Sequence, residues 1–218
     1  MSTVNIIKQK ALLKNDIKAE ENRNLFKEKN VLVLNIISSP GSGKTTLLEN
    51  LAKIFKEKMA VITGDIQTTI DADRINKAGS FALQIETGGS CHLNAQMIKD
   101  TLPNLDFKNL EYLIIENIGN LVCPSTYDLG EHEKMALLSV SEGDEKPEKY
   151  PALFVRANTC VFSKTDLLPY VTFNVERARM SCLKLNQDMK IFEVSNTSQK
   201  GIDLLVEHFK NLRKKYCK

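Results

Sequence analysis

A glycine-rich loop directly follows an apolar run, and few folds accommodate this combination. Residues 31–37 are almost entirely apolar, and residues 38–46 read Ser-Ser-Pro-Gly-Ser-Gly-Lys-Thr-Thr. In a phosphate-binding loop between a strand and a helix, glycines let backbone N–H groups turn inward around a polyphosphate. The lysine reaches the outer phosphates, and the hydroxyl after it binds Mg²⁺. The sequence therefore predicts a nucleotide-binding protein whose phosphate site consists of Gly41, Ser42, Gly43, Lys44, Thr45 and Thr46.

The size and charge of the chain limit the classes of protein that it can belong to. With 218 residues and 42% hydrophobic content, we expect one P-loop domain at 31–218 and an N-terminal helical extension at 1–30. The net charge of +3 is too small to indicate nucleic acid as a partner. The first residues lack a signal pattern and no apolar stretch approaches the ~20 residues of a membrane span, so we expect no membrane association and a cytoplasmic protein. Five cysteines in a reducing compartment indicate free thiols or metal ligands.

Short apolar segments alternate with longer amphipathic segments along the chain. Residues 4–29 have apolar residues at roughly helical spacing, which predicts one or two helices outside the main sheet. Strands are expected near 31–37, 59–63, 82–86, 111–116, 153–162 and 190–194. This alternation is typical of an α/β fold with a mostly parallel central sheet flanked by helices, in which ligands bind at the carboxyl ends of the strands. A polar loop is expected at 141–151.

A second motif, Ser-Lys-Thr-Asp, ends the fifth predicted strand and is a variant of the Asn-Lys-x-Asp motif with which GTPases read guanine. The Asp166 carboxylate can accept hydrogen bonds from guanine N1–H and the exocyclic amine, whereas adenine has no donor at N1. Lys164 is expected to cover the base. Ser163 replaces the usual asparagine, which predicts a somewhat looser pocket. Ser195 and Asn196 follow the last strand, and their backbone N–H groups are expected to point toward guanine O6.

Acidic residues at strand ends are candidate Mg²⁺ ligands, because Mg²⁺ prefers hard oxygen donors. Asp65 follows the second predicted strand and Glu116 ends the fourth, and both are expected to bind Mg²⁺ together with Thr45. Residues Glu-Asn-Ile-Gly at 116–119 have the spacing of an Asp-x-x-Gly switch, so the Gly119 amide is expected to sense the γ-phosphate. Asp71 is a candidate for orienting the attacking water. A helix N-terminal charge is the alternative role for each acid. The predicted catalytic residues are Lys44, Asp71, Glu116 and Gly119.

Cys91, His92 and Cys123 are candidate ligands for a softer metal. The first two lie at a strand-to-helix turn, and the third closes the switch segment. Two thiolates and an imidazole suit Ni²⁺ or Zn²⁺ better than Mg²⁺. A fourth donor would come from water, another side chain or a second copy of the chain. The alternative for a cysteine is a small buried apolar residue, which we expect for Cys160 and Cys182.

The two other histidines are expected outside this cluster. His132 lies in Gly-Glu-His-Glu and is expected to be exposed at the start of a helix, with an auxiliary ligand role as the alternative. His208 is expected on a helix surface. The metal site predicted by the sequence therefore consists of the three residues named above.

Five segments together resemble the HypB family of hydrogenase nickel incorporation GTPases. They are Ser-Ser-Pro-Gly-Ser-Gly-Lys-Thr-Thr-Leu-Leu, Gly-Asp-Ile-Gln-Thr with Asp-Ala-Asp-Arg-Ile, Gly-Gly-Ser-Cys-His-Leu, Glu-Asn-Ile-Gly-Asn-Leu-Val-Cys-Pro, and Lys-Thr-Asp-Leu-Leu-Pro-Tyr-Val. The resemblance spans residues 4–212. It implies a P-loop NTPase fold of the SIMIBI type, GTP and GDP binding with Mg²⁺, and GTP hydrolysis.

The resemblance also implies a role in metal delivery. By resemblance, Cys91, His92 and Cys123 bind nickel or zinc at the interface of a homodimer promoted by GTP and metal. GTP binding would be coupled to nickel transfer toward the large subunit of [NiFe]-hydrogenase, with the nickel chaperone HypA as partner. Some members carry an N-terminal Cys-x-x-Cys-type motif or a His-rich tract. This chain contains neither, so nickel storage is not expected.

The switch segment suggests how the two sites communicate. A γ-phosphate that pulls Gly119 would displace Cys123, so metal affinity and nucleotide state would be linked reciprocally. Our hypothesis is that GTP favours a metal-bridged dimer and that hydrolysis loosens it.

Three other functions are consistent with parts of the pattern. A urease nickel GTPase has the same fold but groups its ligands as Cys-Pro-His, whereas Ser125 follows Cys123-Pro124 here. A small-molecule kinase can use the same phosphate loop, but the guanine motif argues against it. A metal-binding scaffold, in which the nucleotide only sets dimerisation, differs from a GTPase in its turnover.

Overall fold

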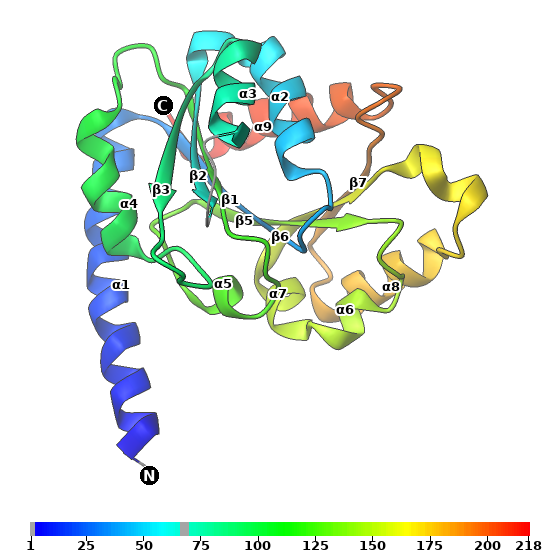
Figure 1. The fold of residues 1–218 in the computed structure, drawn as a ribbon, viewed down its shortest axis with the longest axis horizontal. Coiled ribbons are helices and arrows are strands. Elements are labelled where there is room, and N and C mark those ends of the chain that lie inside the picture. Colours follow the sequence, from blue (N-terminus) through cyan, green and yellow to red (C-terminus); the bar gives the residue numbers. More distant parts are fainter. Residues whose placement is uncertain (1–2, 66–69) are drawn as a thin grey trace.

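Within residues 3–65 and 70–218, which the computed structural model describes, seven parallel strands form one sheet (Figure 1). They are β1 (Leu32–Ser38), β2 (Met59–Asp65), β3 (Phe81–Glu86), β4 (Tyr112–Glu116), β5 (Glu133–Ser139), β6 (Ala157–Ser163) and β7 (Lys190–Glu193). Their order is β3-β2-β4-β1-β5-β6-β7. The side chains of residues 3–9 and of Asp65 lie outside the description. The parallel α/β fold predicted from the sequence is confirmed.

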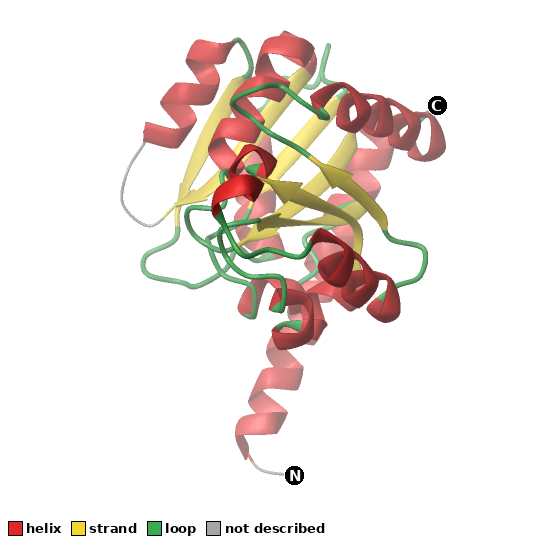
Figure 2. Ribbon diagram, turned by 90° about the vertical axis from the view of Figure 1, so that its right-hand side faces the viewer, coloured by secondary structure: helices red, strands yellow, loops and turns green. Residues whose placement is uncertain are grey.

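Helices cover both faces of the sheet (Figures 1 and 2). The described α-helices are α1 (Thr3–Lys29), α2 (Lys44–Phe55), α3 (Ile70–Ala78), α4 (Ala95–Thr101), α5 (Cys123–Thr126), α6 (Lys146–Lys149), α7 (Pro151–Arg156), α8 (Val175–Leu185) and α9 (Ile202–Tyr216). Short 3-10 helices lie at Lys56–Lys58, Leu102–Asn104 and Thr165–Tyr170. Helices α2, α3 and α9 pack on one face, and α1, α4, α7 and α8 on the other. None of the described helices combines the length and apolar composition that crossing a bilayer requires.

The continuous apolar run in β1 results from burial on both faces. Successive side chains of a strand point to opposite sides of a sheet. Leu32, Leu34 and Ile36 accordingly pack beneath α2 and α9, whereas Val31 and Val33 pack in the core on the α1 side. A strand covered on both faces needs no alternation of polar and apolar residues.

The strand order places the functional loops at one edge of the sheet. Strand β1 lies between β4 and β5, and the chain leaves β1 toward β2 on one side of the sheet but leaves the neighbouring β5 toward β6 on the other. In open parallel sheets the carboxyl ends of two neighbouring strands whose connections leave in opposite directions form a crevice that binds ligands. The loop 39–43 follows β1 at this crevice, and Glu116 ends the neighbouring β4.

Strand β5 was not expected from the sequence. Its residues Glu-Lys-Met-Ala-Leu-Leu-Ser include good helix formers, but the segment pairs with β1 and β6 and is buried on both sides. The strand expected at 153–162 was wrong in its first part, because residues up to 156 belong to α7. The polar loop expected at 141–151 contains the short helix α6.

His132 is not at the start of a helix, as the sequence had indicated. It directly precedes β5 and is half-buried. Its Nδ1 accepts a hydrogen bond of 3.0 Å from the backbone N–H of Val33, and its own backbone N–H donates to the carbonyl oxygen of Val33. Burial lowers the pKa of His132. The auxiliary ligand role is not supported, because this Nδ1 is already used in holding β5 to β1.

His208 is half-buried rather than on the helix surface. Its burial is expected to make the free energy of unfolding fall at acidic pH. Its Nε2 lies 2.9 Å from the Thr159 hydroxyl, and burial, with Lys190 and Lys215 nearby, lowers its pKa to about 4. The unfolded chain binds a proton at this imidazole near its ordinary pKa of about 6.5. The histidine therefore costs stability as the pH falls from about 6.5 to 4. We expect denaturant titrations to show a smaller loss over this range for His208→Gln than for the unsubstituted protein; equal losses would contradict the assignment.

Candidate active site and metal centre

The loop after β1 and the ends of the neighbouring strands enclose a cavity of about 510 Å³. The cavity brings together nine residues that the sequence predicted for the nucleotide site: Gly41, Gly43, Lys44, Thr45, Thr46, Asp71, Glu116, Gly119 and Lys164. Thr63, Arg74 and Asn117 also line it, although no role had been predicted for them from the sequence. Most of the predicted phosphate, magnesium and switch residues thus face one space, whereas Ser42, Asp166, Ser195 and Asn196 are not part of its lining.

The phosphate loop has the backbone conformation that its glycines allow. Gly41 and Gly43 have φ values of +73° and +92°, which L side chains rarely adopt. Ser38 replaces the first glycine of the usual motif, and its buried hydroxyl accepts hydrogen bonds from Ser42 Oγ at 2.5 Å and from Lys44 Nζ at 2.8 Å. Ser38 therefore supports the loop from below and holds the lysine against it.

Hard oxygen donors lie together at the carboxyl edge of the sheet. The Thr45 hydroxyl, at the start of α2, donates to Glu116 Oε1 over 3.3 Å, although the two residues come from different elements. This hydroxyl and carboxylate fit the preference of Mg²⁺ for oxygen ligands. Asp71 of α3 lines the same cavity. The side chain of Asp65, the third predicted Mg²⁺ ligand, lies outside the described residues.

Arg74 is held at the rim of this cavity by an ion pair. Its Nε and Nη2 donate to the two carboxylate oxygens of Glu49 at 3.1 and 2.7 Å, and Nη2 also reaches the Thr46 hydroxyl at 3.3 Å. The hydrogen bond to Glu49 is the main cause of a raised Arg74 pKa. This two-point contact with α2 fixes a cation beside the phosphate loop.

The switch segment packs directly on the phosphate loop at Gly119. A β-carbon at this position would lie 2.9 Å from Pro40 Cγ and 3.0 Å from the Pro40 backbone nitrogen. Only glycine fits without displacing the backbone of the loop. The residue predicted to sense the γ-phosphate is therefore in contact with the loop that would hold it.

The guanine-type motif is tied to the phosphate loop. Ser163 Oγ donates to the carbonyl oxygen of Ser42 at 2.7 Å, and Lys164 Nζ donates to that of Gly41 at 2.6 Å. The expectation of a looser pocket assumed that the connection made by the usual asparagine is lost, but here the serine hydroxyl makes a connection between the loops itself.

The loop after β7 completes this end of the site. Asp166 Oδ1 accepts a hydrogen bond of 2.7 Å from the Ser195 hydroxyl, which orients the carboxylate. The Ser195 backbone N–H donates to the carbonyl oxygen of Lys200 at 3.0 Å and is not directed at a base, in contrast to the expectation. Asn196 contacts the phosphate loop through its side-chain amide, which lies 3.4 Å from the Gly43 carbonyl oxygen.

A substitution of Asp166 tests base recognition. In Asp166→Asn an amide donor would face the N1–H and amine donors of guanine, and an unpaired polar group costs about 1–3 kcal/mol. We expect GDP affinity to fall about 10-fold or more and xanthosine diphosphate, which has a carbonyl oxygen in place of the amine, to gain affinity. Competition titrations measure both, with the exposed Asp203→Asn as control. Unchanged base preference would exclude Asp166 from the base site.

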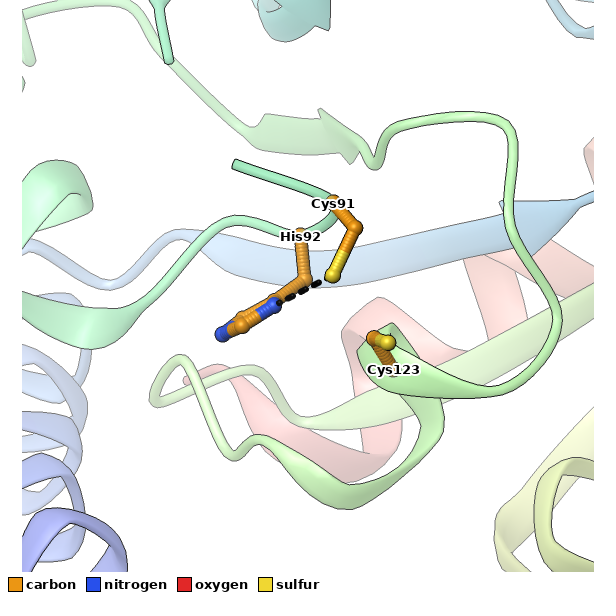
Figure 3. A group of neighbouring side chains, drawn as sticks. All are labelled: Cys91, His92 and Cys123. Carbon is orange, nitrogen blue, oxygen red and sulfur yellow. Dashed lines mark hydrogen bonds between the residues drawn. The ribbon is translucent and has the colours of Figure 1, made fainter. Parts of the chain in front are cut away.

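The three predicted soft ligands lie together (Figure 3). The ligand atoms of Cys91, His92 and Cys123 are all within 4.8 Å of one another. Cys91 Sγ lies 3.4 Å from His92 Nδ1. Cys91 is exposed, and the other two are half-buried, so an ion could enter and leave from solvent. By contrast, Cys160 and Cys182 are fully buried, which confirms their assignment to the core.

The surroundings of the cluster affect the protonation of its ligands. The His92 ring packs against the Tyr127 ring in a tilted arrangement, with 3.8 Å between ring centroids. Burial lowers the His92 pKa, which favours the neutral imidazole that binds metals. The neighbouring Cys123 thiol, together with burial, raises the pKa of Cys91. Metal binding at this cluster would therefore release protons.

Asn117 links the switch segment to the loop that carries Cys91 and His92, a role that had not been predicted from the sequence. Its buried side-chain oxygen accepts hydrogen bonds from the backbone N–H groups of Leu93 at 3.2 Å and Ile118 at 3.0 Å. Its amide nitrogen donates to Asn35 of β1 at 3.3 Å. The nucleotide cavity and the metal cluster thus share a buried contact besides their covalent connection.

Known proteins resemble this chain over most of its length. Residues 32–193 match the nucleotide-binding domain described as CobW/HypB/UreG. The hydrogenase maturation factor HypB of Escherichia coli is 48% identical over 192 residues, which is 87% of this chain but only 66% of that protein. The hydrogenase/urease maturation factor HypB of Helicobacter pylori is 45% identical over 209 residues, 94% of this chain and 85% of that protein. The crystal structure of HypB from Helicobacter pylori in complex with nickel has a TM-score of 0.90 and 42% identity, covering 94% of this chain and 98% of that one.

Proposed function

Because this chain belongs to the HypB family of maturation factors, we propose that it is a nickel-binding GTPase that regulates nickel insertion into [NiFe]-hydrogenase. The observation that carries the proposal is the position of the segment 116–123. Glu116 and Gly119 line the nucleotide cavity, and Cys123 at the other end belongs to the metal cluster. A short stretch of backbone therefore connects a phosphate sensor to a thiolate.

The predicted nucleotide-site residues would have separate roles in GTP hydrolysis. Lys44 would leave Ser38 and contact the outer phosphates, while the backbone N–H groups of the glycine-rich loop surround them. Thr45 and Glu116 would hold Mg²⁺, which supplies positive charge against the charge that develops on the phosphoryl oxygens. Asp71 would orient the attacking water, and Asp166 would select guanine.

The metal cluster would hold nickel as cargo, with zinc as a competing ion. Three ligands leave a position open, and a second copy of the chain can fill it by a symmetric contact. A GTP-promoted homodimer would then carry the ion between identical patches. A HypA-type chaperone would supply nickel, and the hydrogenase large subunit would receive it.

Coupling between the sites follows from their shared segment. A γ-phosphate that attracts the Gly119 amide would shift Cys123, and Asn117 would pass the same movement to the backbone next to His92. Binding free energies are reciprocal, so nickel would change GTP affinity by the same factor.

Nickel affinity in two nucleotide states tests this function. We expect the protein with a non-hydrolysable GTP analogue and the protein with GDP to differ in nickel affinity by about 5-fold or more, because couplings of this kind are typically at least that large. Titration with nickel, with the mass of the complex measured alongside, gives both affinity and subunit number. Equal nickel affinities in the two nucleotide states would contradict the coupling and show that the two sites are independent.

Delivery to urease is a second candidate function. It is favoured by the Helicobacter pylori relative, whose name includes both enzymes. The same nucleotide and metal residues would act in both cases, because only the receiving apoenzyme differs. Activation of nickel-free hydrogenase and of nickel-free urease by the loaded protein distinguishes the two.

A further inference from the structure

Helix α1 contacts both loops that carry the ligands of the metal cluster (Figure 1). We call residues 91–95 the first ligand loop and residues 123–131 the second ligand loop. The amide nitrogen of Asn22 donates to the carbonyl oxygen of Ala95 at 2.9 Å and to that of Leu129 at 3.0 Å. The side chain is 1% exposed. A single buried amide group on α1 therefore bonds to both ligand loops.

Asn15 makes a second bridge of the same kind. Its Oδ1 accepts a hydrogen bond of 2.9 Å from the backbone N–H of Ala95, and its Nδ2 donates to the carbonyl oxygen of Asp128 at 2.8 Å. Asn15 and Asn22 are about two helical turns apart and so lie on one face of α1. Together they bond to the first ligand loop just after His92 and to the second ligand loop after Cys123.

The second ligand loop is seated closely on the helix. Arg23 donates to the carbonyl oxygen of Glu131 at 2.9 Å and forms an ion pair with Asp128 at 2.5 Å. A β-carbon at Gly130, where φ is +92°, would lie 2.6 Å from the carbonyl oxygen of Ala19. Helix α1 thus acts as a frame against which this loop is positioned.

We propose that Asn15 and Asn22 are positioning residues of the metal site, setting the separation between Cys91 with His92 on one loop and Cys123 on the other. The proposal rests on the metal-binding function proposed above. Metal sites lose affinity when the groups that orient their ligands are removed. The described lining of the nucleotide cavity comes from elements other than α1, so the effect should be confined to the metal.

Nickel titration of matched variants tests the proposal. We expect Asn22→Ala and, independently, Asn15→Ala to bind nickel about 10-fold more weakly and to shift the thiolate-to-nickel absorption band, with GDP affinity unchanged. Asn24→Ala, an exposed asparagine on the same helix, is the control and should bind as the unsubstituted protein does. Unchanged nickel affinity in both variants, or a parallel loss of GDP affinity, would overturn the positioning role.

A second measurement reports the loop separation without any metal. Dibromobimane loses two bromides as two thiolates attack it, and it becomes strongly fluorescent only when both arms have reacted. In a Cys217→Ser background, we expect it to bridge Cys91 and Cys123 more slowly in Asn22→Ala than in Asn24→Ala, with peptide mass identifying the bridge. Equal rates refute the proposal. If the rates differ but the unsubstituted protein binds no nickel, the proposed function fails while the positioning role stands.

Discussion

Lys44→Ala is expected to hydrolyse GTP no faster than GTP is hydrolysed in buffer without protein, while its fold stays intact. The lysine lies at the start of α2 with its Nζ on the phosphate loop, and the Ser42 to Ser38 hydrogen bond that supports the loop does not depend on it. Removing one charge-stabilising donor from an active site typically costs about 100- to 1,000-fold in rate. In the proposed function Lys44 would also be the main contact to the outer phosphates, so we expect a loss at the upper end of that range.

Single-turnover hydrolysis, with enzyme in excess of GTP, separates this effect from slow product release. Lys53→Ala removes an exposed lysine from the same helix and should hydrolyse GTP normally. Hydrolysis at the normal rate by Lys44→Ala would show that Lys44 does not take part in catalysis. If the unsubstituted protein also shows no turnover but still dimerises with nucleotide, the protein is a metal-binding scaffold and not a GTPase.

Cys123→Ser is expected to eliminate tight nickel and zinc binding at the cluster. A serine hydroxyl is a poor ligand for these borderline ions, and Cys123 provides one of the three ligand atoms that lie within 4.8 Å of one another. Loss of a partner outside the ligand shell already costs about 10- to 100-fold in affinity. Direct loss of a ligand should therefore cost more than about 100-fold.

Competition with a chromophoric chelator under reducing conditions measures this affinity. Cys217→Ser is the matched control, because this half-buried cysteine lies at the end of α9 and outside the cluster. Cys123→Ser should also lose the dependence of nickel affinity on nucleotide, while its GDP affinity stays normal. Nickel binding within about 3-fold of the unsubstituted protein would show that the ion is held by other residues.

The phosphate loop could be predicted because its requirements are local. Two glycines, which allow the positive φ found at Gly41 and Gly43, a lysine and a hydroxyl at fixed offsets, and an apolar strand in front of them can all be identified within about fifteen residues of sequence. The soft-metal cluster was predictable for a different reason. Cys91, His92 and Cys123 share a ligand chemistry, and the carboxyl ends of parallel strands meet at one edge.

Strand β5 could not be predicted from its residues. Met-Ala-Leu-Leu favours helix as much as strand, and only pairing with β1 and β6 selects the extended form. The same is true of His208, whose neighbour Thr159 lies on another element. Helical periodicity places such a side chain on a surface, and the packing of α9 against β6 and β7 determines that it is half-buried.

Local patterns were therefore enough to locate the phosphate loop and the Ser-Lys-Thr-Asp motif, since each is marked by residue types at set distances along the chain. Shared ligand chemistry was enough to group Cys91, His92 and Cys123. The asparagines that hold these parts together carry no such mark. Asn22 bonds to residues 73 and 107 positions away, and Asn117 to one 24 positions away. The local sequence around an asparagine in a polar helix is the same whether its side chain faces solvent or a buried carbonyl group. Only the packing of distant segments distinguishes the two cases.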